Sequence, residues 1–162
     1  MKSPILAVAA LALTVSSIHG AQDKNKLPAE VDAALRTTST AVLYSLEPWA
    51  EPDAPGKRLH RYKILGQTML EQKQTASAIA EFKTAIGHWN GVLAMCFDPR
   101  HGLRVTANGQ TYDLLLCYAC NQLYVYRGDR LVTSLGVTGS PRVLNDLLAA
   151  AKIPLSKSGE KP

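Results

Sequence analysis

The spacing of apolar residues changes along the chain, and the changes predict where strands and helices lie. Over residues 40–46 apolar positions alternate, which places Val42, Tyr44 and Leu46 on one face of a half-buried strand. Residues 59–70 show a similar alternation and predict a second strand. Between these runs, a stretch rich in proline predicts an irregular loop.

Two stretches have the longer apolar spacing that is typical of helices. Over residues 74–89 apolar positions recur every three or four residues, and they are Ile79, Phe82, Ile86 and Trp89. We expect this helix to cover the sheet, with Trp89 in the core. The same spacing predicts a helix over residues 140–152, where Ser140 and Pro141 suit its first positions and Pro154 lies beyond its end.

The middle of the chain reads as a series of strands joined by turns. Residues 92–96 form a short apolar run that predicts a strand. Asn108-Gly109 suits the two positive-φ positions of a tight hairpin turn, so Ala107 should face Gln110. Residues 112–126 are rich in β-formers and form one bent strand or two.

A last strand is predicted over residues 130–135, after a turn at Arg127-Gly128-Asp129. Runs of strands with only two clear helices favour an α+β domain over a parallel, doubly wound fold. The predicted fold is therefore an antiparallel, meander-rich sheet packed by the helices at 74–89 and 140–152.

The first twenty residues have the features of a secretory signal peptide. Lys2 precedes an uncharged apolar run over residues 5–15 that is too short to span a bilayer, and small residues follow it up to Ala21. The competing interpretation is a buried N-terminal helix. A cleaved leader predicts a periplasmic or secreted protein with no membrane span after cleavage.

The remaining chain divides into three predicted parts. Residues 21–38 form an N-terminal segment that is partly disordered, although Pro28 suits the first turn of a short helix. Residues 39–155 form a single α+β domain. Residues 156–162 are polar and predict a disordered tail.

Composition excludes some classes of protein. The chain has 162 residues, of which 46% are hydrophobic and 19% charged, which is typical of a folded domain. The net charge of +5 becomes +4 when Lys2 is removed with the leader. The densest basic cluster, residues 57–63, is short and is interpreted as a solvated strand edge. We therefore expect no nucleic-acid partner.

All three cysteines lie between residues 96 and 120. In an oxidising compartment two of them should pair. Extending the hairpin register backward places Cys96 opposite about residue 121, which favours a Cys96–Cys120 disulfide and then Cys96–Cys117. A Cys117–Cys120 disulfide needs a tight turn, because residues three apart in an extended strand are separated by about 10 Å.

Two other interpretations of the cysteines stay open. Cys96, His101, Cys117 and Cys120 together form a ligand set suited to structural zinc. Alternatively, Arg100 or His101 lowers the pKa of a reactive thiol. Arg100 and His101 are also candidate binding residues. We assign no catalytic residues, and a bound cofactor is expected only in the zinc interpretation.

The segment around these residues resembles a known family. Cys-Phe-Asp-Pro-Arg-His-Gly-Leu-Arg over residues 96–104 and Asp-Leu-Leu-Leu-Cys-Tyr-Ala-Cys over residues 113–120 are similar to the CFxPRHGIR and DLVICFEC segments of an uncharacterised family of small exported bacterial proteins. Ile153-Pro154-Leu155 also resembles that family's Val-Pro-Leu ending. Tyr118-Ala119 departs from its usual Phe-Glu. The resemblance implies a shared architecture and no catalytic residues.

These features predict a non-enzymatic exported module that binds another protein, of an inhibitor or immunity type. The partner is expected to be an envelope or secreted protein. The alternative function is a metal- or thiol-dependent enzyme that uses His101 together with Cys96, Cys117 and Cys120.

Overall fold

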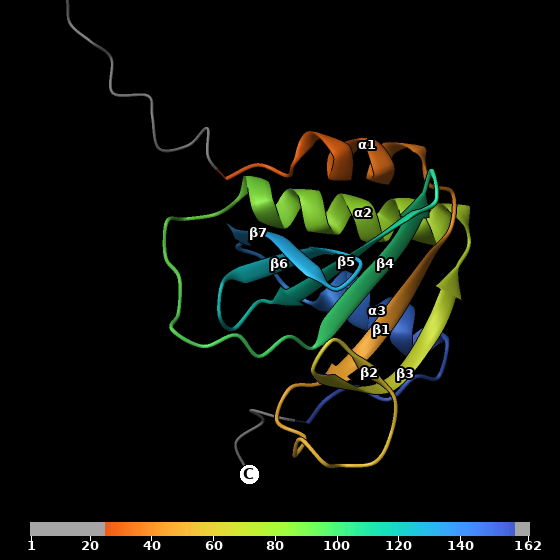
Figure 1. Cartoon of the computed structure of the whole chain (residues 1–162), viewed down its shortest axis with the longest axis vertical. Helices are drawn as coiled ribbons and strands as arrows, with labels where there is room; N and C mark the ends of the chain where they lie inside the picture. Colours follow the sequence, from red (N-terminus) through yellow and green to blue (C-terminus); the bar gives the residue numbers. More distant parts are fainter. Residues whose placement is uncertain (1–24, 158–162) are drawn as a thin grey trace, which may run out of the picture.

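The structure of the protein, a computed structural model, describes residues 25–157. Within that range three helices pack against a seven-stranded antiparallel sheet (Figure 1). The predicted signal peptide lies outside the described residues, and so do residues 158–162 of the predicted tail. The α+β fold expected from the sequence is confirmed.

The elements follow one another in a simple order. They are α1 (Ala29–Thr37), β1 (Ala41–Glu47), β2 (Arg58–Leu59), β3 (Tyr62–Leu70), α2 (Gln72–Gly87), β4 (His101–Ala107), β5 (Gln110–Cys117), β6 (Gln122–Arg127), β7 (Arg130–Gly136) and α3 (Arg142–Ala150). The two helices predicted from apolar spacing correspond to α2 and α3.

The sheet combines a crossover with a meander. Its strand order is β2-β3-β1-β4-β5-β6-β7, and each neighbouring pair is antiparallel. Because β3 and β4 both run antiparallel to β1, they are parallel to each other, and α2 is the crossover helix that joins them. From β4 to β7 the chain forms consecutive hairpins. This meander, with its turn after β5, carries His101, Cys117 and Cys120.

All three helices cover the same face of the sheet. Large side chains from this side include Phe82 of α2 and Leu144 and Leu148 of α3, each fully buried. Val31 and Leu35 of α1 join the same core. Burial of apolar surface on this scale is the main favourable term in folding.

The opposite face carries a second, aromatic core. Phe97 stacks on Tyr124 with ring centroids 3.6 Å apart, and Tyr62 meets Phe97 edge to face. Tyr44 and Leu46 of β1 belong to the same cluster, in agreement with the alternation read from the sequence. The loop between α2 and β4, together with β2, therefore covers part of this face.

The predicted hairpin turn is confirmed. Asn108 and Gly109 have φ of 50° and 72°, and Ala107 pairs with Gln110. The β-rich run over residues 112–126 is two strands, separated by a turn at residues 118–121.

Two other strand predictions need correction. The run at 59–70 is divided by His60, whose φ of 53° reverses the chain between β2 and β3. Residues 92–96 do not form a strand, and this segment lies in the loop between α2 and β4. The side chains of Val92 and Leu93 are more than half exposed. Apolar content alone had indicated a buried strand there.

Trp89 also differs from the prediction. Helix α2 ends at Gly87, so Trp89 lies beyond it and is only partly buried. Its indole lies against Gly136, where a Cβ atom would overlap the ring, and its Nε1–H donates to the carbonyl of Val92 at 3.2 Å. Trp89 therefore fixes the start of the loop against the end of β7.

The folded region extends beyond the boundaries drawn from the sequence. Helix α1 follows Pro28 in the segment 21–38, where a short helix was expected beside partial disorder. Asn25 hydrogen-bonds with Gly136. At the other end, the hydroxyl of Ser156 donates to Glu47 at 3.1 Å. Among the described residues, no helix is long and apolar enough to cross a membrane.

Candidate functional site

The turn after β5 holds two of the cysteines. The N–H of Asn121 donates to the carbonyl of Tyr118 at 3.1 Å, and Asn121 adopts a φ of 55°. This closes the tight turn that a Cys117–Cys120 disulfide requires, and the two Cα atoms are 5.2 Å apart. Cys117 and Cys120 are joined in a disulfide, and both are buried.

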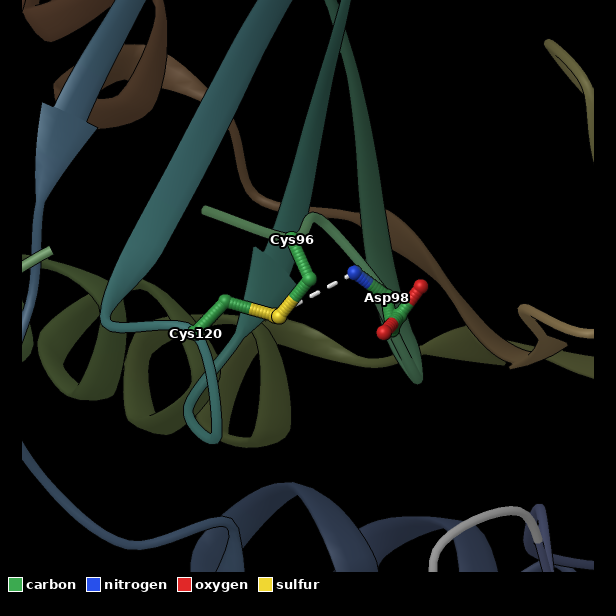
Figure 2. A group of neighbouring side chains, drawn as sticks. All are labelled: Cys96, Asp98 and Cys120. Atoms are coloured by element: carbon green, nitrogen blue, oxygen red, sulfur yellow. Dashed lines mark hydrogen bonds between the residues drawn. The ribbon is translucent and has the colours of Figure 1, made fainter. Parts of the chain in front are cut away.

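Cys96 completes a cluster of three sulfur atoms. Its Sγ lies 3.2 Å from that of Cys120, and Cys96 itself is exposed and keeps its thiol. Figure 2 shows its side chain pointing toward Cys120, with the N–H of Asp98 donating to the Cys120 sulfur at 3.2 Å. The structure thus brings together the favoured pair, Cys96 and Cys120, but bonds Cys120 to Cys117.

The structure does not assemble the four-ligand zinc set. His101 pairs with Leu116, so both face the helices, whereas the next residue of β5, Cys117, faces the opposite side. Among the described residues, the group of potential ligands close enough for one metal ion is Cys96, Asp98 and Cys120. Cys120 is already in a disulfide, so that group requires reduction first.

His101 is a buried, neutral side chain. Its Nε2 lies 2.8 Å from Oδ1 of Asn145 in α3. Burial lowers the pKa of His101 to about 4, the positive charge of Arg100 adds to the lowering, and the Asn145 hydrogen bond only partly opposes them. A neutral imidazole held by an amide ties β4 to α3, and it provides no positive charge for activating a thiol.

A cavity of about 330 Å³ lies beside this histidine. Arg100 and Asp98 line it from the loop, Tyr118 from the turn and Asn145 from α3. Arg100 and His101 therefore line the same cavity, and their role in binding stays a prediction. Tyr118 Oη donates a hydrogen bond to Glu81. Burial raises the pKa of Tyr118 well above its usual range, and the hydrogen bond and negative charge of Glu81 raise it further. The phenol is neutral.

A polar network on the other face was missed in the sequence. Asp113 is buried, and its carboxylate accepts two hydrogen bonds from Arg104, one from Nε at 2.6 Å and one from Nη2 at 2.7 Å. Nε2 of His60 contacts the same carboxylate at 2.9 Å, and its ring stacks on Tyr126. Alternation within β4 and β5 could have paired Arg104 with Asp113, but nothing local places His60 there.

The pKa of Asp113 follows from two opposing effects. Burial acts to raise the pKa of the carboxyl, but the hydrogen bonds from Arg104 and His60 outweigh it and hold the pKa below its ordinary value. Asp113 is therefore ionised and fully engaged. The network stabilises this face of the sheet, and the Asp113 carboxylate is engaged by both partners.

The loop between α2 and the cysteine cluster is apolar and exposed. We call residues 89–96 the apolar loop. Val92, Leu93 and Met95 expose 56%, 53% and 105% of their surface. Its backbone is nevertheless held, because Gln122 Nε2 donates to the carbonyls of Ala94 at 2.5 Å and Cys96 at 2.8 Å. The N–H of Ala94 also donates to the Cys120 carbonyl.

Comparison with known proteins does not assign the chain to a family. No family model, curated protein or solved structure matches the chain. The resemblance to the family of small exported bacterial proteins therefore stays a prediction.

Proposed function

We propose that the protein is an exported binding module that recognises another protein through the apolar loop. The observation that carries this proposal is the exposure of Val92, Leu93 and Met95 on a loop whose backbone is fixed. Exposed apolar side chains that gather in one segment are typical of interaction sites. Single exposed apolar residues elsewhere on the surface have no such meaning.

The fixed backbone supports recognition for an energetic reason. Binding costs conformational entropy when a flexible loop becomes ordered, and prior ordering removes much of that cost. Here the side chains of Gln122 and Trp89 hold the loop at both ends, and the turn at Cys120 holds its middle. The apolar side chains are thus presented in a defined arrangement before any partner arrives.

The expected partner is an envelope or secreted protein with an apolar depression at its surface. Its location follows from the predicted leader, and its chemistry follows from the apolar loop. The three exposed side chains could fill such a depression, and the surrounding polar backbone would form the rim. No substrate conversion is needed to explain this surface.

A pull-down with matched variants tests the proposal. The chain from Ala21 onward is immobilised and exposed to envelope and secreted fractions of a native host. We expect Leu93→Asp to abolish recovery of a stoichiometric protein. The control is Leu131→Asp, which changes another exposed leucine, on β7, and should leave recovery intact. Circular dichroism confirms that both variants fold.

The proposal also has a clear contrary result. Equal recovery of the partner by Leu93→Asp and by the unchanged protein would show that the apolar loop is not the binding surface. Failure of the unchanged protein to retain any partner from either fraction would argue against a binding module.

A further inference from the structure

The three sulfur atoms of the cysteine cluster are arranged for chemistry as well as for stability. We propose that they form a thiol–disulfide exchange site, in which Cys96 and Cys117 alternate as the disulfide partner of Cys120. The inference is independent of the binding function proposed above. It requires only the positions of the three side chains.

The geometry supplies a nucleophile next to its target. Exchange proceeds when a thiolate attacks one sulfur of a disulfide. Cys96 Sγ is 3.2 Å from Cys120 Sγ, and Cys96 is the exposed member of the cluster. Solvent can therefore remove its proton, while the disulfide sulfurs are buried.

The reaction is balanced within the protein. The Cys96 thiolate attacks Cys120 Sγ, so a Cys96–Cys120 bond forms and the Cys117–Cys120 bond breaks. The electron pair of the broken bond goes to Cys117 Sγ, which takes up a proton in place of the one that Cys96 lost. One disulfide and one thiol are present before and after, so no external oxidant or reductant is needed.

Backbone N–H groups support both sulfur atoms of the breaking bond. The N–H of Cys120 donates to Cys117 Sγ at 3.1 Å, where negative charge develops on the leaving group. The N–H of Asp98 donates to Cys120 Sγ at 3.2 Å and holds the attacked atom next to Cys96. Hydrogen bonds to a charged sulfur are stronger than those to a neutral one.

Exchange changes which sulfur atoms face the solvent. Before exchange the thiol is on exposed Cys96, and afterwards it is on Cys117, whose surface is 2% exposed. The exchanged form carries its disulfide at Cys96, where an external thiolate can attack Cys96 Sγ and release Cys120 as a thiolate. The substrates of the site are therefore thiols, either small molecules or cysteine side chains of other proteins.

Disulfide mapping tests the internal step. The oxidised chain from Ala21 onward is incubated at pH 8, then unfolded in acid, where exchange stops, and its thiol is trapped with a maleimide. We expect two populations, one labelled at Cys96 and one at Cys117. The Cys117→Ser variant should form the Cys96–Cys120 disulfide completely, and Cys96→Ser should retain Cys117–Cys120.

The rate of reduction tests access from outside. Glutathione should reduce the disulfide of the unchanged protein at least tenfold faster than that of Cys96→Ser, because that variant has only the buried pair. Equal rates, or label on Cys96 alone together with two free thiols in Cys117→Ser, would overturn the proposal. Three labelled thiols without reductant would also overturn it, with or without bound zinc.

Discussion

At the scale of single residues, the polar network of Asp113 shows how a buried negative charge is stabilised on the sheet face that carries the aromatic core. The carboxylate is 1% exposed, and Arg104 binds it through two nitrogen atoms. Nε2 of His60 contacts one of the same carboxylate oxygens, Oδ2. A buried charge is tolerable only when it is paired and fully hydrogen-bonded. Each partner comes from a different strand or turn, so the network joins the turn between β2 and β3 to β4 and β5.

Replacing Asp113 by Asn should therefore destabilise the protein. We expect the free energy of unfolding to fall by about 2 kcal/mol at pH 7, because hydrogen bonds to a charged group are lost. Solvent partly screens the charge of Arg104, which limits the size of this loss. Urea denaturation measures the change. Asp129→Asn, in an exposed turn, is the control and should change stability by less than about 0.5 kcal/mol.

The cost of Asp113→Asn should also depend on pH. The pKa of Asp113 is lower in the folded protein than in the unfolded chain, so its contribution is complete above about pH 4. That contribution is lost as the pH falls through the folded value. A stability difference between the two proteins that grows on acidification would contradict the assigned ion pair.

His101 predicts a different pH dependence. Its pKa of about 4 lies below the value of about 6.5 expected in the unfolded chain, so unfolded protein binds more protons between these values. Stability should fall by on the order of 3 kcal/mol as the pH decreases from about 6.5 to about 4. His101→Gln should lack this part of the dependence, and His88→Gln, an exposed control, should retain it.

Nuclear magnetic resonance gives a direct check on His101. Its imidazole signals should not titrate until the pH approaches 4. Titration near 6.5 would place the ring in water rather than against Asn145.

At the scale of elements, the sequence predicted those features that depend on neighbouring residues in the chain, such as turns and helices. The Asn108-Gly109 turn fixed the β4–β5 register, and apolar spacing located α2 and α3 to within two residues at each end. The apolar loop was predicted wrongly, because apolar residues indicate burial in general. Its backbone is held by the side chain of Gln122 and the carbonyl of Cys120 and forms no strand ladder, which apolar spacing cannot reveal.

The candidate site was predictable to a similar extent. Proximity of Cys96 to the Cys117-Cys120 pair follows from the hairpin register. The bonded pair depends on the turn at Asn121, and a positive φ at asparagine is not required by the sequence. Separation of His101 from the cysteines follows from strand alternation, which the zinc interpretation had not taken into account.

The junction between α2 and β7 gives a prediction at this scale. A Cβ atom on Gly136 would overlap the indole of Trp89, which starts the apolar loop. We expect Gly136→Ala to displace Trp89 and to lower the free energy of unfolding by about 1–3 kcal/mol. Urea denaturation followed by tryptophan fluorescence measures both effects.

Gly87→Ala is the matched control for Gly136→Ala. Gly87 lies at the end of α2, and a Cβ atom there meets no other atom within 4 Å. This substitution should be neutral or slightly stabilising, because alanine is the better helix former. Equal costs for the two variants would show that Trp89 does not require a glycine opposite it.

At the scale of the whole molecule, the two faces of the sheet have different tasks. The three helices cover one face and contribute most of the apolar core. The other face holds the aromatic core, the Asp113 network and, at one end, the cysteine cluster with the apolar loop. Both proposals therefore concern the face without helices. The helical face contributes the packing that holds the sheet in place.

Helix α1 belongs to the core on the helical face, and its removal would show how much that core depends on it. Val31 and Leu35 are almost fully buried against the helical core, and Asp32 pairs with Lys83 of α2 at 2.8 Å. Burial of two such side chains contributes about 4 kcal/mol, which is a large part of the 5–15 kcal/mol that stabilises an ordinary domain. The domain cannot then begin at residue 39 without a large loss.

We expect a chain that begins at Ser39 to lose cooperative thermal unfolding, whereas a chain that begins at Ala21 should unfold in one transition. Leu35→Asp in the longer chain separates loss of packing from truncation, because it removes the apolar contact and retains the segment. It should lower the melting temperature by more than 10 °C in a domain of this size. Equal melting temperatures for the two chain lengths would show that α1 is an accessory to the domain and that the core is complete without it.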